Sequence, residues 1–408
     1  MTSAHKSTFM AVLAALLLGL APQIGAQDIA IHGAMSQSFM QTSDNNYLVE
    51  SEDGSFSIFE MVLNTTANID AKTRIGAQIY GREFGHLGNN HMLVDWAFGD
   101  YRWRNWMGFR AGRIKFSLGL YNTTRDIDMV RNSILMPQSV YTEDFRNVSN
   151  AFHGFEIYGS VPVDRLGSFE YHASLGSAEV DEAYFLHDVF IKVLAAGGQI
   201  PPSLGFEANL DWAYSGSLYW NTPWEGLKIG GSFVTSDLYA EESFATPTAT
   251  LDMSLDMDLK KLYVLSAEYM RDRWTFAAEF QRLFVDIVVP DVPVFVPDVG
   301  VVLMDIPADD RRGGYYGQAT YRASDLLELG IYLSVFHPDW SQRKVGTAET
   351  EQKDTALTAR FDLTDSWLMK VEYHIIDGTG DLPERLNPDP SQLVKSWSMI
   401  AVKSTFYF

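Results

Sequence analysis

The sequence contains no cysteine, and among its 408 residues only 31 Lys and Arg stand against 52 Asp and Glu. The absence of thiols excludes a disulfide scaffold, thiolate catalysis and Cys-ligated zinc or iron–sulfur sites. The formal net charge of −21 argues against nucleic-acid binding, because proteins of that class need a basic surface to displace counterions from phosphate. With 46% hydrophobic residues, the chain is also too apolar to be disordered.

Long apolar runs are missing as well. No segment approaches the 18 consecutive apolar residues that a membrane-spanning helix needs. The chain starts with a short polar stretch carrying Lys6, continues with an apolar core from Phe9 to Leu20, and reaches small residues ending at Ala26. This pattern is typical of a secretory signal peptide over residues 1–26, and it predicts that residues 27–408 form the exported domain.

In residues 27–408, apolar and polar residues alternate with a period of two. Between residues 59 and 69 the odd positions are mostly apolar and the even positions mostly polar, and the pattern resumes after a tight connection at residues 70–72. Alternation of this kind predicts strands with one apolar and one wet face. Sixteen segments follow it, each long enough for a tilted strand to cross a membrane: 28–40, 56–69, 73–84, 91–100, 103–115, 152–162, 167–177, 205–218, 226–237, 255–270, 273–285, 314–323, 326–337, 354–363, 366–376 and 395–408.

The connections between these segments alternate between short and long. Short turns are expected at 70–72, 99–101, 164–167, 271–273, 323–325 and 364–365, and long loops at 41–54, 116–151, 178–204, 238–254, 286–313, 338–353 and 377–394. Short turns at one end and long loops at the other are typical of a transmembrane antiparallel β-barrel. A soluble β-sandwich would also alternate, but it would need two domains, and no Pro- or Ser-rich linker separates any.

The last strand carries a local signal. Ile400, Val402, Phe406 and the terminal Phe408 share one face, interrupted only by Ser404. This arrangement resembles the C-terminal signature of Gram-negative outer-membrane proteins. The resemblance implies that Phe406 and Phe408 form an assembly signal, in which the last Phe is read by the barrel-assembly machinery.

Taken over residues 27–408, the chain resembles a 16-stranded Gram-negative porin. The longest loop follows the fifth strand, where porins carry the third extracellular loop that folds inward, and the segment Gly112 to Tyr121 is similar in style to the porin segment there. The Pro-Glu-Phe-Gly-Gly signature of the enteric general porins is absent. The resemblance implies an all-β barrel in the outer membrane, surrounded by outer-membrane lipids, with an inward third loop and a homotrimeric assembly.

The polar face of each strand should line the lumen, which in a 16-stranded barrel is wide enough for an aqueous channel. The acids on that face are Glu60, Asp95, Glu156, Glu170, Glu207, Asp211, Glu268, Glu279, Glu328, Asp362 and Glu372, and the bases are Arg74, Arg82, Arg110, Lys228, Arg322, Arg360 and Lys370. Bases gather on the third and fifth strands and acids on the sixth to eleventh, which predicts a field across the pore.

The pore-lining and constriction candidates combine these walls with the long loop. The wall supplies Glu60, Arg74, Arg82, Asp95 and Arg110, and the segment leading into the loop supplies Arg113 and Lys115. The loop itself supplies Arg125, Asp126, Asp128, Glu143 and Asp144, with Arg131 and Arg146 nearly cancelling its acids. The excess of acids in the wall predicts a weak preference for cations, unless the charges of the constriction determine the selectivity instead.

These features predict a porin that lets small hydrophilic solutes and ions diffuse passively, without a cofactor, a metal or catalysis. Neither Gly-x-Ser-x-Gly nor His-Glu-x-x-His occurs. His86 and His91 are spaced unfavourably for a metal pair. Two alternatives remain open: a substrate-selective channel for small organic anions, and an adhesin or receptor barrel without an open pore.

Two long loops have unusual composition. Residues 181–198 read as an amphipathic helix that caps the mouth or packs on a neighbouring loop. Residues 286–307 are apolar for an exposed loop and repeat Val-Pro-Asp-Val. The first-ranked interpretation of the second segment is an extension of its hairpin beyond the membrane, followed closely by contact with a neighbouring subunit or the vestibule.

Overall fold

The computed structural model describes residues 29–85, 87, 89–180, 184–195, 202–245, 250–296 and 300–408. Its strands are β1 (Ile29–Thr42), β2 (Ser55–Asn68), β3 (Thr73–Phe84), β4 (Asn89–Arg104), β5 (Met107–Lys115), β6 (Ala151–Val163), β7 (Gly167–Val180), β8 (Ser203–Asn221), β9 (Leu227–Ala245), β10 (Thr250–Arg271), β11 (Trp274–Val296), β12 (Gly300–Pro307), β13 (Gly313–Arg322), β14 (Leu327–His337), β15 (Gln352–Thr364), β16 (Trp367–Gly378) and β17 (Ser396–Tyr407).

Helical structure is confined to short pieces. They are η1 (Asn122–Thr124), η2 (Asp128–Val130), α2 (Arg146–Ser149), α3 (Tyr184–Ala195), η3 (Trp340–Gln342), η4 (Ala348–Thr350) and η5 (Pro390–Gln392). None of the helices described is long and apolar enough to cross a membrane.

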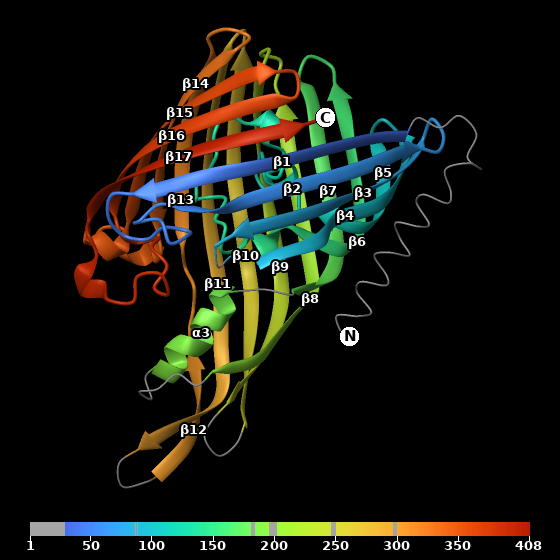
Figure 1. Cartoon of the computed structure of the whole chain (residues 1–408). Helices are drawn as coiled ribbons and strands as arrows, with labels where there is room; N and C mark the ends of the chain where they lie inside the picture. The colour runs from blue at the N-terminus through green and yellow to red at the C-terminus, as the bar shows by residue number, and fades with distance from the viewer. Residues whose placement is uncertain are drawn as a thin grey trace.

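The strands form one antiparallel sheet that closes on itself, because β1 pairs with β17 from Ala34 opposite Tyr407 to Thr42 opposite Met399. β12 pairs with β11 alone in the described sheet, so the other sixteen strands make the wall. The all-β, 16-stranded barrel predicted from the alternation is therefore confirmed. Short connections lie at one end, called the turn end, and long ones at the other, called the loop end (Figure 1).

The apolar face of the strands points outward. Large hydrophobic side chains that remain exposed on the barrel surface include Leu63, Ile75, Phe109, Ile157, Leu175, Leu218, Phe233, Leu265, Phe276, Leu329, Leu333, Leu357, Tyr373 and Ile400. Exposed tryptophans lie near the turn end at Trp103, Trp106, Trp224 and Trp274. An apolar outer band edged by aromatic residues is the surface that a bilayer requires of a barrel.

Four strands are longer than the alternation suggested. β8 to β11 continue past the loop end, and with β12 they form an extension that α3 covers on one side (Figure 1). Phe190 of α3 packs edge-to-face on Phe244 of β9, with ring centroids 6.4 Å apart. The extended hairpin ranked first for residues 286–307 is confirmed, as is the helix within 181–198, of which 184–195 are described. The loop expected at 238–254 was wrong, since 238–245 and 250–254 are strand.

Two further expectations were wrong for local reasons. The turn expected at 99–101 lies at residues 105–106, because Asp100 faces the lumen and accepts a hydrogen bond from Arg74, which keeps this segment in β4. Glu207 is exposed rather than inward, because a register shift between Leu210 and Trp212 of β8 reverses which parity faces the lumen.

Candidate functional site

Residues 116–150 connect β5 to β6 and lie inside the barrel; we call them the inner loop. Thr123 and Val130 are its exposed positions among those whose burial is described. Polar loop residues are buried here because the polar lumen face of the wall supplies hydrogen-bond partners. The inward third loop implied by the resemblance therefore has a counterpart in the structure, and its path is set by contacts on two sides of the lumen.

On one side, Asp128 fixes the far end of the loop to β16 and β17. Its carboxylate lies 2.7 Å from Lys403 Nζ and 3.5 Å from Lys370 Nζ, and it accepts a hydrogen bond from the Thr405 hydroxyl at 3.0 Å. Arg131 of the loop completes the set at 2.9 Å. Both lysines are fully buried, so each needs a nearby anion.

Glu372 of β16 extends this anchor through the loop backbone. It accepts the amide hydrogens of Ile134 at 2.6 Å and Leu135 at 3.2 Å. His374 lies 3.2 Å from Glu372 and 3.0 Å from Asp354 of β15, so it links the two carboxylates. This side of the lumen thus holds the loop through a connected network of charged groups.

On a second side of the lumen, Glu279 of β11 holds the loop through neutral donors. It accepts hydrogen bonds from the hydroxyls of Tyr141 (2.5 Å), Tyr316 (2.7 Å) and Ser266 (2.6 Å), and from the amide of Leu120 (2.9 Å). No lysine or arginine forms an ion pair with Glu279 in the described structure. The contact is therefore made of hydrogen bonds alone.

The base of the loop is tied to β3, β4 and β5. Glu143 lies 2.7 Å from Arg82 of β3 and 2.9 Å from Arg125 of the loop. Asp126 forms ion pairs with Lys115 and Arg146. These groups are all buried, so the base of the loop is a second neutralised cluster.

Asp95 joins the same cluster from β4. Its carboxylate lies 2.8 Å from Lys115 Nζ and accepts a hydrogen bond from Gln78 at 2.8 Å. Glu60 of β2 links the base to the far anchor, since it forms an ion pair with Lys403 and accepts the Tyr80 hydroxyl at 2.5 Å.

Other predicted residues lie elsewhere. Arg74 and Arg110 form a ladder toward the turn end: Arg74 pairs with Asp100 at 2.9 Å, and Arg110 pairs with Glu156 at 2.6 Å. Neither forms a hydrogen bond or ion pair with the inner loop in the part of the chain that the structure describes. The structure therefore separates these two arginines from Arg82, with which the sequence had grouped them.

Four further candidates lie outside these clusters. Arg113 lies on the outer face of β5, with Nη1 3.3 Å from His153 Nε2 on β6, so its assignment to the pore was wrong. Asp144 pairs with Arg385 of the loop between β16 and β17 at 3.4 Å. Phe406 and Phe408 are 51% and 73% exposed on the outside of the closing strand.

Sequence reasoning missed several contributors to the site. Tyr121, Tyr141 and Tyr316 were not singled out, and neither was Lys403. The signal for Lys403 was available, because it has the parity opposite to Ile400 and Val402. His86 and the side chain of His91 lie outside the described residues, as does the signal peptide. The described residues hold no group of three or more His, Asp or Glu suited to a metal ion.

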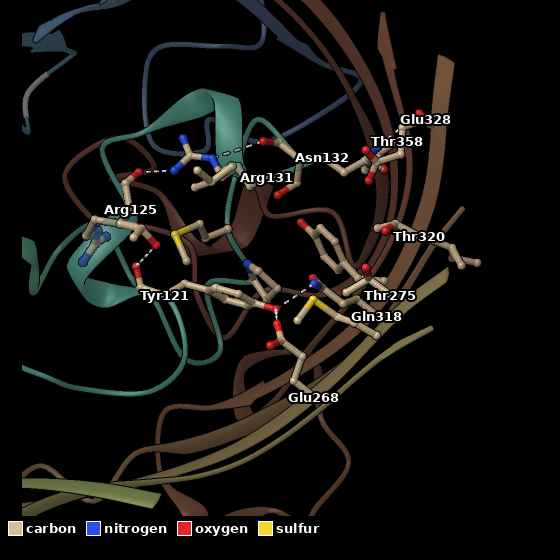
Figure 2. A pocket seen from close by; sticks show the side chains of 18 residues that line it. Tyr121, Arg125, Arg131, Asn132, Glu268, Thr275, Gln318, Thr320, Glu328 and Thr358 are labelled. Carbon is tan, nitrogen blue, oxygen red and sulfur yellow. Dashed lines mark hydrogen bonds between the residues drawn. The ribbon is translucent and has the colours of Figure 1, made fainter. Parts of the chain in front are cut away.

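Space remains on both sides of the inner loop. Toward the turn end, a cavity of about 160 Å³ separates the loop from β10, β11 and β13 to β15. Figure 2 shows Tyr121 and Arg125 on the loop side, and Gln318 and Thr320 on the wall side. Arg131 and Glu328 also line it, so the cavity carries both signs of charge.

Toward the loop end lies a vestibule of about 1020 Å³. Its acids are Asp144, Asp309, Asp310, Asp339, Glu349, Asp381 and Glu384, and its bases are Arg311 and Arg312. Burial raises the pKa of Asp381 to about 7, and the carboxylate of Asp144 acts in the same direction. With seven acids against two bases the vestibule is acidic, and Asp381 is only partly ionised at neutral pH.

A void of about 30 Å³ lies between these two spaces. It shares Arg312 with the vestibule and Arg125 with the 160 Å³ cavity, and Tyr141 and Phe145 also line it. This volume is about that of one water molecule. Arg125 therefore lines both this void and the 160 Å³ cavity.

No protein-family model matches the sequence, and a search of curated proteins finds no match. Solved structures do match over nearly the whole chain. An anion-selective porin from Comamonas acidovorans is 12% identical, with a TM-score of 0.52 over 94% of this chain and 100% of its own. OmpF of Salmonella typhi, in complex with daunomycin, is 12% identical, with a TM-score of 0.54 over 93% and 97%.

The trimer form of in-vitro folded OmpT, an outer-membrane protein of Vibrio cholerae, is 10% identical, with a TM-score of 0.51 over 94% of this chain and 100% of its own. At such identities the likeness concerns the fold. The chain has a porin-like, outer-membrane type of β-barrel fold.

Proposed function

We propose that this protein is a channel of the bacterial outer membrane, through which small hydrophilic solutes and ions diffuse passively. The observation that carries the proposal is a polar inner loop held inside a membrane-type barrel, with solvent-sized spaces on both of its sides. Water-filled lumens and inward-facing charged residues are what channels of this architecture use for selection. We place the loop end outside the cell and the turn end in the periplasm.

The proposed path runs from the acidic vestibule, past Arg312 and Arg125, into the 160 Å³ cavity. Because the void between them has the volume of one water molecule, the path in this conformation admits water and small ions, and larger solutes pass only when the loop shifts. A low conductance is expected for the same reason.

The proposed selectivity is a weak preference for cations. The vestibule concentrates cations through its excess of acids over bases, whereas Arg125, which lines the small void, is neutralised by Glu143. Long-range attraction of this kind weakens with salt, since the Debye length is about 8 Å at 0.15 M. The preference should therefore fade as ionic strength rises.

Assembly and export form part of the proposal. Residues 1–26 would direct export, the strand ending at Phe408 would be read by the barrel-assembly machinery, and three copies would associate. The trimer form of the Vibrio protein and the exposed apolar surface of this barrel support the last point. Neither a cofactor nor an enzymatic reaction is part of the proposal.

The test is single-channel recording of the refolded protein in planar bilayers, with the reversal potential measured under a salt gradient. Small steps in groups of three, with a cation-shifted reversal potential that shrinks in high salt, are expected. An anion shift would refute the role given to the vestibule. A barrel that folds correctly but never conducts would refute the channel and favour a receptor barrel, for which the 30 Å³ void is the supporting observation.

A further inference from the structure

A group of cations and aromatic rings lies on the outer surface of β10 and β11, where the apolar band ends toward the loop end. We call Lys261, Arg282, Phe284, Trp340 and Arg343 the rim patch. The Arg282 guanidinium carbon lies 4.6 Å from the Phe284 ring centroid and 4.7 Å from that of Trp340. Lys261 Nζ lies 4.8 Å from the Phe284 ring, and Arg343 lies 5.2 Å from that of Trp340. The five side chains therefore form one surface.

Two local features of the backbone build this patch. A register irregularity in β10 inserts Lys260, so Lys260 and Lys261 are both exposed despite being consecutive. Gly313 lies opposite Arg282 on β13, and a β-carbon there would stand 2.5 Å from Arg282 Cδ and 2.8 Å from Trp340 Cε3. Only a glycine at 313 leaves room for the stack of arginine on tryptophan.

The charge of the patch is only partly offset by the protein, through the carboxylate of Asp339, which acts on Arg282 from the adjoining loop. Lys260 forms ion pairs with Asp258 and Asp286, but Lys261, Arg282 and Arg343 form none in the part of the chain that the structure describes. The Arg282 Nε is buried and has no hydrogen-bond partner there. Three unpaired cations in a chain with a net charge of −21 indicate an anionic partner from outside the protein.

The neighbouring side chains identify the kind of partner. In β10, the outward residues that follow Lys261 toward the turn end are Tyr263 and then Leu265, which is 56% exposed. Tyr315 and Leu333 of β13 and β14 are exposed as well. A ligand that covers both parts of this surface must join an anionic head to apolar chains.

We propose that the rim patch binds the phosphate group of an outer-leaflet lipid, whose acyl chains lie along the apolar band below it. Guanidinium groups match phosphate oxygens with paired hydrogen bonds, and basic clusters beside the membrane recognise anionic headgroups. The inference requires the barrel to lie in the outer membrane, but it does not depend on conduction.

The test is native mass spectrometry of the folded protein in detergent micelles, titrated with diphosphorylated lipid A and with its dephosphorylated form. Arg282→Gln and the double variant Lys261→Gln, Arg282→Gln are compared with Arg271→Gln, which removes an exposed arginine at the turn end of β10, the strand that carries Lys261. Lipid affinity should fall about fivefold for each rim charge removed, and stay unchanged in the Arg271 variant. Gly313→Ala should lower the affinity without changing the charge.

Several results would overturn the proposal. Equal binding of the two lipids would show that phosphate is not recognised, and equal loss in the Arg271 variant would show that any surface cation serves. Displacement of lipid A by millimolar inorganic phosphate would identify a free anion as the ligand. Dissociation of an oligomer in the rim variants, with lipid binding retained, would make the patch a contact between copies of the chain. Single-channel conductance, measured alongside, tests the channel separately.

Discussion

Replacing Asp128 by Asn tests how the inner loop is held against β16 and β17. The change keeps the size of the side chain but removes the charge that faces the buried Lys370 and Lys403. Removing one partner of a buried ion pair typically costs about 3–5 kcal/mol, because the remaining charge is left unsolvated. Lys403 keeps Glu60, and Lys370 keeps the Asp128 and Ser133 carbonyls, so the lower part of that range is expected.

Because the loss falls on the contact between loop and wall, the loop should detach before the barrel unfolds. A cost of about 3 kcal/mol corresponds to a rise of about two orders of magnitude in the population of the detached loop. Hydrogen exchange followed by mass spectrometry should show that rise in peptides covering Ile134 and Leu135. Single-channel records should show larger and noisier currents.

The matched control is Asp144→Asn, in the same loop and with the same change of charge. Asp144 lies 3.4 Å from Arg385 and its side chain is 30% exposed, so the expected cost is about 0–1 kcal/mol. If Asp128→Asn leaves both hydrogen exchange and conductance at the level of the control, the anchoring role argued for Asp128 is refuted.

Three other outcomes follow from the contacts described. Tyr141→Phe removes the hydrogen bond to Glu279 and the one that the Tyr141 hydroxyl accepts from the Tyr121 amide, so it should cost about 2–3 kcal/mol, seen as at least tenfold faster exchange of the loop on the β11 side and unaltered exchange near Asp128; equal change on both sides would contradict it. The raised pKa of Asp381 means that the folded state keeps a proton that the unfolded state releases, so stability should fall as pH rises from about 4 to about 7; in Asp381→Asn, thermal unfolding followed by circular dichroism should lose this dependence. Deletion of Phe408 should lower the yield of heat-modifiable barrel in outer membranes but not in detergent refolding, and an equal loss in both would indicate a purely structural role.

Alternation predicted most of the fold because it reports directly which face of a strand is apolar. The deviations arose where the backbone breaks that rule. The register shift at Leu210 turned Glu207 outward, and Asp100 drew a segment rich in turn residues into β4. The lengthening of β8, β9 and β10 escaped prediction because the inner face of these strands is apolar there, as in Leu238 and Phe244, whereas the lumen was expected to be polar.

The contacts of the inner loop could not be predicted from the sequence. The sequence identified the charged residues of the loop but not the residues they contact. The alternation of a strand predicts which face a side chain lies on, but it does not predict which side chain across the lumen will contact it. Asp128 and Lys403 are 275 positions apart, and Asn132 and Thr358 are 226 apart. Arg113 and Lys115 are both basic residues at the entry to the loop, and the sequence predicted both to line the pore. Only Lys115 forms an ion pair with the loop, through Asp126.

The two sides of the inner loop differ in a way that bears on how the channel would open. Near β16 and β17 the loop is held by ion pairs among fully buried groups, and separating them would leave charges without solvent. Near β11 it is held by hydroxyl and amide donors on Glu279, each worth about 1.5–3 kcal/mol, and one of these donors, Tyr141, also lines the 30 Å³ void. A shift of the loop that widens the path beside Arg125 is therefore expected to separate Tyr141 from Glu279 while Asp128 stays in place.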